Sequence, residues 1–457
     1  MRTLLALLLV SVPVFAGTSN SLLDISPDGS KLLVANTDRG TITAVDLATR
    51  KVICELPAGD SPEAAAWIGN GPRGVAVVYG DDTLVFFDVN DRKITHILKV
   101  ADEPYGIVTT KDGKRAYVTH DYPGSVSEID LVNHKVLRSF KVGENCRGIA
   151  ISNDEKILYV TEFLTSKLIG VEIASGKAVD SWSGYEMDNL CRHVQLHPTR
   201  PKAYLAHQRS RTNVFDARGS IFPQLSYCDL WEKPEKRRRS TGLDSYNGVI
   251  VTATPWETAL SPDGKKLYIL YAGTNDANVS TVYDDDYRES ERDRLVKLGR
   301  HPRAIRTHGD KVYVYNTLDC EVTVHDSNLK QLHAIAVTSP AQTPEWVRGK
   351  ELFNSARRPM GGTGWVACAS CHQDGLTDGR VWENPEGNRR TPHLFGVAHT
   401  HPLHFSADRD ESQDFEYTVR GKLMQGRGLY DGKITGTPEL ELHMAGKSKD
   451  LDAMALY

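Results

Sequence analysis

A turn signature that recurs at a nearly constant interval constrains the fold of this 457-residue chain more than any other feature. Ser26-Pro-Asp-Gly29 and Ser261-Pro-Asp-Gly264 are its clearest copies, and each precedes a run of β-branched and aromatic residues. The seven turns start at residues 26, 70, 111, 153, 198, 261 and 308. A period of about 40–45 residues with several short strands per unit is typical of β-propeller blades. We therefore expect an all-β, seven-bladed propeller over residues 17–339.

The strand after several turns carries a Tyr-Val-Thr run, as in Tyr117-Val-Thr119 and Tyr159-Val-Thr161. These runs and the Ser-Pro-Asp-Gly turns resemble the YVTN family of β-propeller repeats over roughly residues 20–338. The resemblance implies the fold but not the activity, because propellers host many unrelated functions.

Aligning the turns brings one column of residues to the start of each innermost strand, beside the expected axis. Three arginines and two aromatic residues in this column predict a mouth that attracts anions and is partly apolar. The alternative is that each arginine pairs with a neighbouring carboxylate or carbonyl group. The column comprises Ser21, Glu63, Tyr105, Arg147, Arg192, Trp256 and Arg303.

The N-terminus has the pattern of a secretory signal. Arg2 precedes an apolar run from Leu4 to Val12, and Val14-Phe-Ala16 fits a cleavage site, so we expect a signal peptide over residues 1–16. The run is too short to span a bilayer, and nothing later resembles a span. A formal net charge of −4 with both signs dispersed gives no indication of nucleic-acid binding. We expect a bacterial protein of the periplasm or cell surface, or a secreted one.

Disulfides are permitted in such compartments. Cys146 and Cys191 occupy equivalent positions in neighbouring repeats, directly before Arg147 and Arg192. A bridge requires their Cα atoms to come within about 7 Å. We predict a Cys146–Cys191 disulfide.

The second informative motif is Cys368-Ala-Ser-Cys371-His372. Two cysteines at this spacing with a histidine directly after the second are the attachment signature of c-type haem. Each thiol forms a thioether with one haem vinyl group, and His372 becomes the proximal ligand of the iron. A zinc site would need a second ligand pair of similar spacing, and no other C-x-x-C occurs. The motif predicts one covalent haem c at Cys368, Cys371 and His372.

A turn-rich linker from Thr338 to Pro344 marks the expected domain boundary. Pro344 suits a first helical position, and apolar residues at 347, 352 and 353 predict a helix before the haem motif. We therefore expect a multidomain chain in which a mainly α-helical cytochrome c domain over residues 340–457 follows the propeller.

The haem motif, Arg389-Arg-Thr-Pro392 and His401-Pro-Leu-His-Phe405 together resemble bacterial dihaem cytochrome c peroxidases over residues 344–430. The resemblance implies a peroxidase-like oxidoreductase with two haems. This chain carries one C-x-x-C-H, and the loop around Trp382 lacks the histidine that several family members have there. Relative to that family the domain is truncated at its C-terminus or has lost a haem, which leaves peroxidase activity open.

Two kinds of residue are candidates for the other side of the iron. Met424 follows His372 by 52 residues, a span typical of the methionine loop of simple cytochromes c, although it also suits a core position. His393, His399, His401 and His404 are alternative ligands or acid–base groups, with His401 and His404 as the catalytic candidates.

The sequence thus supports two functions of different classes. The first is electron transfer by an exported haem c protein, in which the propeller binds a redox partner protein, a small electron donor or acceptor, or a small anionic ligand. The second is a non-enzymatic propeller interaction module whose single haem relays or senses electrons. A propeller that oxidises a substrate itself would need a cofactor that the sequence does not indicate.

Overall fold

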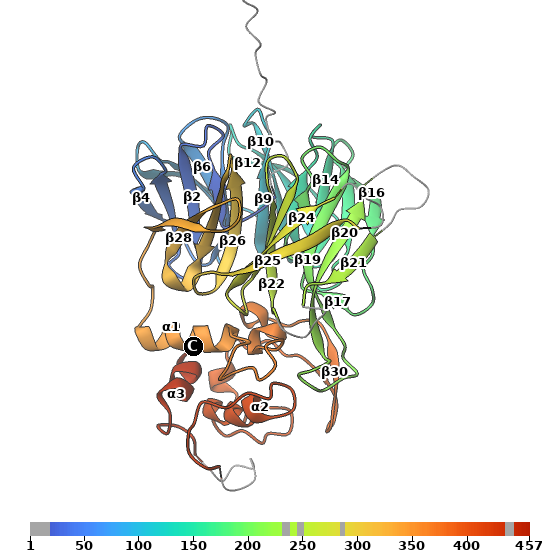
Figure 1. Ribbon diagram of the computed structural model, residues 1–457. Helices are drawn as coiled ribbons and strands as arrows, with labels where there is room; N and C mark the ends of the chain where they lie inside the picture. Colours follow the sequence, from blue (N-terminus) through green and yellow to red (C-terminus); the bar gives the residue numbers. More distant parts are fainter. Residues whose placement is uncertain (1–18, 231–237, 245–250, 284–287, 435–442) are drawn as a thin grey trace, which may run out of the picture.

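The computed structural model describes residues 19–230, 238–244, 251–283, 288–434 and 443–457, and the expected signal peptide lies outside them. Seven antiparallel sheets follow one another along the chain, and the seventh packs on the first, which confirms the seven-bladed propeller. Figure 1 shows the propeller from the side. In most blades the first strand is buried and the fourth is exposed, so the first lies nearest the axis.

Blades 1 to 4 follow the expected repeat, with four strands each in chain order. Their strands are β1 Leu23–Ile25, β2 Lys31–Asn36, β3 Thr41–Asp46 and β4 Lys51–Pro57; β5 Pro62–Trp67, β6 Arg73–Val78, β7 Thr83–Asp88 and β8 Lys93–Lys99; β9 Pro104–Thr109, β10 Arg115–His120, β11 Ser125–Asp130 and β12 Lys135–Lys141; β13 Cys146–Ile151, β14 Ile157–Glu162, β15 Leu168–Glu172 and β16 Lys177–Trp182.

Blade 5 departs from the repeat, at the place where the turn spacing lengthens. Its inner strand is split in two, and the next two strands are nine residues long. The strands of blades 5 to 7 are β17 Asp188–Asn189, β18 Gln195–Leu196, β19 Lys202–Ser210, β20 Ile221–Asp229 and β21 Arg238–Gly242; β22 Pro255–Leu260, β23 Lys266–Tyr271, β24 Asp276–Val282 and β25 Ser290–Lys297; β26 Pro302–His308, β27 Lys311–Asn316, β28 Glu321–Asp326 and β29 Gln331–Ala336.

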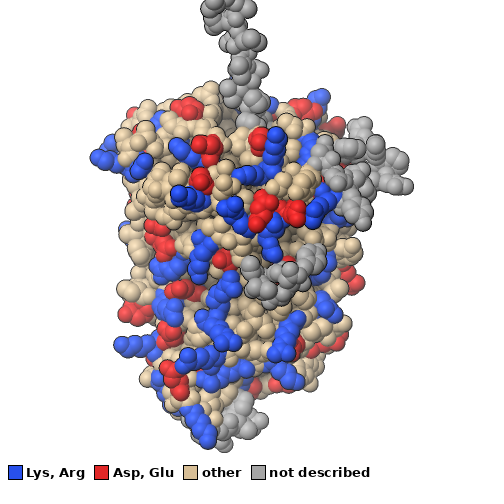
Figure 2. Space-filling view, viewed as in Figure 1, with Lys and Arg blue, Asp and Glu red and all other residues tan. Residues whose placement is uncertain are grey.

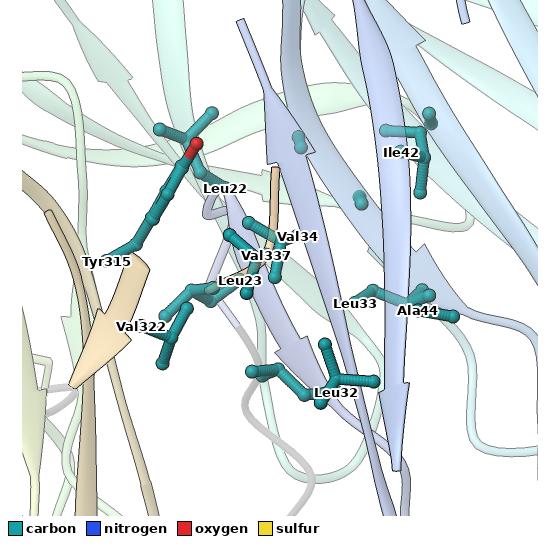
Figure 3. Close-up of a cluster of buried hydrophobic side chains, with 14 of the residues drawn as sticks. Leu22, Leu23, Leu32, Leu33, Val34, Ile42, Ala44, Tyr315, Val322 and Val337 are labelled. Atoms are coloured by element: carbon teal, nitrogen blue, oxygen red, sulfur yellow. The ribbon is translucent and has the colours of Figure 1, made fainter. Parts of the chain in front are cut away.

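Apolar side chains fill the space between adjacent blades. Figure 3 shows the largest cluster, where Leu23 and Val34 of blade 1 meet Tyr315 and Val322 of blade 7. Tyr315 also donates a hydrogen bond of 2.9 Å from its hydroxyl to Asn36 Oδ1. Blade 7 therefore packs directly on blade 1 and closes the ring, so that these sheets have no interblade gap.

The segment after blade 7 lies beneath one end of the propeller in Figure 1 and begins as predicted. Helix α1 (Pro344–Asn354) starts at Pro344, and the Thr343 hydroxyl accepts a hydrogen bond from the Trp346 backbone N–H at 3.3 Å. After the last blade, the chain forms mostly turns and loops.

The expectation of a mainly α-helical domain is wrong. The described part of residues 340–457 has three short helices, of 11, 5 and 8 residues. Glycines such as Gly364, Gly375, Gly379 and Gly396 have positive φ, which interrupts any right-handed helix. The remaining elements are α2 Glu416–Arg420, α3 Lys449–Leu456, the hairpin β30 Val381–Asn384 and β31 Gly387–Arg390, and 3-10 turns at Cys368–Ser370, Gln373–Gly375, Val397–His399 and Ser412–Phe415.

Two further properties of the described residues concern helix length and surface charge. Within the described ranges, every helix is too short or too polar to cross a bilayer. Lys and Arg side chains are interspersed with Asp and Glu over the face that Figure 2 shows. Such mixed charge on this face matches the small net charge of the sequence.

Candidate functional site

The 3-10 turn at Cys368–Ser370 directs both cysteines of the C-x-x-C-H motif into one apolar cluster. Burial raises the pKa of the Cys368 thiol to about 12, and burial followed by the nearby Asp378 raises the pKa of Cys371 well above its usual value. A redox dithiol needs a depressed pKa to react as a thiolate. These are neutral thiols in an apolar environment. The cluster contains Ile221, Leu352, Met360, Val366, Trp382, Val419 and Met424, with Trp365, Leu423, Leu429 and Met454 packed against it.

His372 is oriented by a backbone contact. Its Nδ1 lies 3.1 Å from the carbonyl oxygen of Pro392. Because a carbonyl only accepts, this contact assigns the ring proton to Nδ1, so Nε2 is the nitrogen that carries the lone pair. Burial lowers the pKa of His372, which Asp378 opposes in part, so the ring is neutral at pH 7.

Blade 5 of the propeller fixes the motif through two buried amides. Gln208 on β19 donates from Nε2 to the Ser370 carbonyl at 2.9 Å, and Asn189 on β17 donates from Nδ2 to the Asp378 carbonyl at 3.2 Å. Trp382 adds a third contact at this point, because its Nε1 donates a hydrogen bond of 2.9 Å to Asp378 Oδ2. Blade 5 therefore positions the segment 368–378, called the attachment segment below because it carries the C-x-x-C-H motif.

The sixth-ligand candidates separate into two groups. Met424 is buried in the cluster against which the cysteines pack. Met360, which was not among the predicted ligands, is buried there too. The glycine pair Gly361-Gly362 directly after Met360 allows close backbone packing and is the one feature of the sequence that could have indicated its burial.

The four candidate histidines are all exposed. His401 Nδ1 lies 2.6 Å from the Asp410 carbonyl oxygen, and His404 Nδ1 lies 2.8 Å from Asp408 Oδ1. His393 is close enough for its charge to lower the pKa of His372. His401 and His404 thus have surface partners of their own, and no contact joins them to the cysteines within the described residues.

The predicted Cys146–Cys191 disulfide is not formed, since the structure holds both as buried free thiols. Cys146 packs with Val108 and Val160 between blades 3 and 4, whereas Cys191 packs with Trp182 and other residues between blades 4 and 5. Equivalent positions in consecutive blades face consecutive interblade cores, which separates the two sulfurs.

The predicted axial column does converge. Arg147, Arg192 and Arg303 are each 2% exposed. The Arg147 guanidinium lies 3.7 Å above the Phe163 ring, and those of Arg192 and Arg303 lie 3.6 and 4.4 Å from the Trp256 ring centre. Cations and aromatic faces therefore alternate around the mouth. A small cavity there is lined by Ser21, Glu63, Tyr105, Arg192, Trp256 and Arg303, among others.

Each arginine of this mouth also has a carboxylate partner, as the alternative proposed. Arg147 pairs with Asp121 at 2.6 Å, and Arg303 pairs with Glu63 at 3.2 Å. The third carboxylate is Asp374, which lies 3.2 Å from Arg192 and is two residues beyond His372. The mouth and the attachment motif are therefore parts of one continuous arrangement.

Among the residues that the structure describes, no three His, Cys, Asp or Glu side chains converge as a metal-binding group. A haem iron does not require such a group, because the protein supplies one side chain to each face at most.

Comparisons with known proteins bear on the fold. No family model matches the chain, and no curated protein matches it. Among solved structures, Kuenenia stuttgartiensis hydrazine synthase is similar with a TM-score of 0.61 and 23% identity, over 67% of this chain and 95% of that one.

Two further structures give the same picture. A functionally unknown protein from Desulfotomaculum acetoxidans DSM 771 is similar with a TM-score of 0.51 and 14% identity, over 66% of this chain and 94% of that one. The Myceliophteria thermophila Cps50 (Swd1) β-propeller domain is similar with a TM-score of 0.50 and 10% identity, over 70% of this chain and 96% of that one. At these identities the likeness establishes that the chain has a β-propeller fold.

Proposed function

We propose that this chain is an exported electron-transfer protein that carries one covalent haem c at Cys368, Cys371 and His372, with the propeller as the platform for the attachment segment. The observation that carries the proposal is the combination of two neutral thiols in an apolar cluster with a neutral histidine that is oriented by the Pro392 carbonyl. A histidine that binds a metal through one ring nitrogen is usually oriented by a hydrogen bond from its other ring nitrogen.

The residues around the motif fit a porphyrin because they are apolar. The cluster offers an apolar wall, with Leu352, Met360 and Val366 all nearly inaccessible to water. Burial raises the pKa of both cysteine thiols, so they are protonated at pH 7. Bound haem would supply a one-electron iron couple, and this protein's apolar side chains would exclude water from it.

For the sixth ligand we propose Met424. Its thioether belongs to the cluster against which both cysteines pack, and its backbone carbonyl accepts a hydrogen bond of 2.9 Å from the Gly362 N–H, which holds its loop against the segment before the motif. With haem bound, the Met424 thioether would raise the reduction potential and favour electron transfer.

The expected signal peptide supports location in the periplasm or at the cell surface, where haem c is attached. The partner is then a redox protein or a small electron donor or acceptor. The hydrazine synthase likeness covers about two thirds of the chain at 23% identity, so it supports the propeller as a scaffold and adds nothing to the choice of partner.

The test is the optical spectrum of the full chain purified from a bacterial host that matures c-type cytochromes. We expect a c-type haem spectrum that survives denaturation, because the link is covalent. Cys368→Ser and Cys371→Ser should each lose one thioether and shift the reduced band, whereas Cys320→Ser, a half-buried cysteine of the propeller, should leave the spectrum unchanged. A colourless protein would refute the proposal.

A further inference from the structure

Asp374 carries its carboxylate from the attachment segment into the arginine-lined mouth of the propeller. Its Oδ2 lies 3.2 Å from Arg192 Nη1, and its Oδ1 lies 3.6 Å from Arg303 Nη2. These two arginine side chains are 2% and 3% exposed. A single carboxylate therefore bridges guanidinium groups of blades 5 and 7.

The backbone at this point has a positive φ. Asp374 has a φ of 55°, in the left-handed region, within the turn Gln373–Gly375. Aspartate enters this region more often than most other residues that carry a Cβ. In this conformation the carboxylate reaches Arg192 and Arg303.

The mouth has more donor capacity than Asp374 uses. Arg192 Nε and Nη2 and Arg303 Nε are buried and have no hydrogen-bond partner among the described residues. Arg192 Nη1 is shared between Asp374 and the Tyr105 hydroxyl, at 3.2 and 2.8 Å. Buried guanidinium groups with free N–H donors bind carboxylates strongly, because each can donate two parallel hydrogen bonds.

The geometry favours Asp374 over its neighbour as the carboxylate that joins the two arginines. Asp374 lies 3.2 Å from Arg192 and 3.6 Å from Arg303, so it contacts both guanidinium groups. Glu63 forms an ion pair with Arg303 at 3.2 Å. Asp374 is thus the carboxylate that the two arginines share.

We propose that the axial mouth of the propeller is a carboxylate-binding site that the chain fills with its own Asp374, and that a small external monocarboxylate takes this place when the Asp374 side chain is removed. The internal ligand fastens the attachment segment to the propeller by a contact separate from the haem. This site does not depend on the proposed electron transfer.

Asp374→Gly is the variant that isolates the site. Glycine adopts a φ of 55° without strain, and the substitution removes the atoms that acetate would restore. Titration calorimetry and thermal unfolding of the full chain should show acetate binding at least tenfold tighter to Asp374→Gly than to the native chain. Acetate should also raise the Tm of this variant selectively, because a ligand that binds the folded state stabilises it.

Two controls separate this result from general salt or backbone effects. Asp82 also has a positive φ, of 54°, and its Oδ1 accepts a hydrogen bond from the Glu103 N–H, so Asp82→Gly should not respond to acetate. Acetamide, the neutral isostere of acetate, should not raise the Tm of Asp374→Gly. If Asp374→Gly folds poorly, acetate but not acetamide should restore its folded yield.

Three outcomes would overturn the proposal. They are equal acetate affinity in the native chain and Asp374→Gly, equal effects of acetate and acetamide, and an Asp374→Gly protein that neither binds acetate nor gains folded yield from it. Each result is independent of haem, so it stands whether or not the electron-transfer proposal survives.

Discussion

Gln208 of blade 5 and Ser370 of the C-x-x-C-H motif are joined by a buried hydrogen bond of 2.9 Å between the Gln208 amide and the Ser370 carbonyl oxygen. The two residues are 162 positions apart in the chain. The propeller therefore contributes directly to the backbone geometry of the attachment motif.

Replacing Gln208 should destabilise the protein because the Ser370 carbonyl would lose its buried donor. We expect Gln208→Leu to lower the free energy of unfolding by about 1–3 kcal/mol in urea denaturation. Gln331→Leu, an exposed position on β29, should stay within about 0.5 kcal/mol. Equal stabilities for the two variants would show that the amide contact is dispensable.

The buried ion pair of Arg147 and Asp121 should be costly to break. Arg147→Met leaves the Asp121 carboxylate without its partner in the interior, and we expect a loss of about 3–5 kcal/mol in unfolding free energy. The exposed pair of Arg427 and Asp431 is the matched control, since Arg427→Met should cost no more than about 1 kcal/mol. Similar losses in both variants would contradict a special role for burial.

The repeat made the fold predictable, and symmetry made the mouth predictable. Turns such as Ser261-Pro-Asp-Gly264 act locally, and equivalent positions of seven blades must converge on the axis, which is why Arg192 and Arg303 could be placed together from sequence. The same symmetry argument failed for Cys146 and Cys191, because equivalence between blades gives similar surroundings and not contact.

The contacts of the attachment segment could not be predicted in this way. Gln208 and Asp374 act across long sequence separations, and no pattern within either segment indicates the other. The helical content was overestimated. The pattern of helix α1 is real, but the resemblance to cytochromes led to the expectation of further helices after it, and glycines with positive φ interrupt that region.

The stability of the propeller should depend on pH through Glu257. Burial raises the pKa of this carboxyl to about 7, although Arg306 opposes the shift. The folded state therefore holds a proton that the unfolded state releases near pH 4.5, so this contribution is complete below pH 4.5 and is lost as pH rises to about 7. The loss amounts to about 3 kcal/mol.

Urea denaturation from pH 4.5 to pH 8 tests this dependence. Glu257→Gln should remove that part of the decline between pH 4.5 and 7, because an amide does not titrate. Glu172→Gln, at an exposed position on β15, is the comparison and should leave the decline unchanged. A Glu257→Gln profile parallel to the native one would contradict the assignment.

The two buried methionines should differ in their effect on the haem. If Met424 is the sixth ligand, Met424→Ala should change the oxidised spectrum towards high spin and lower the reduction potential, since the thioether stabilises the reduced iron. Met360→Ala should leave the ligation unchanged and reduce stability by about 2–5 kcal/mol, as for other buried methionines. The reverse pattern would make Met360 the ligand.

His372→Ala should alter the iron and leave the propeller folded. The far-ultraviolet circular dichroism of this variant should keep its β-sheet signal, because the seven blades bury their own interblade clusters. Loss of that signal would mean that the propeller depends on the attachment segment for folding.

The central claim is a porphyrin held by two sulfur–carbon links at Cys368 and Cys371, and the intact mass of the denatured protein tests it most directly. For protein made in a host that matures c-type cytochromes, we predict the mature chain mass plus one haem, reduced to the bare chain in a Cys368→Ser, Cys371→Ser double variant. A native mass without that increment would contradict the account.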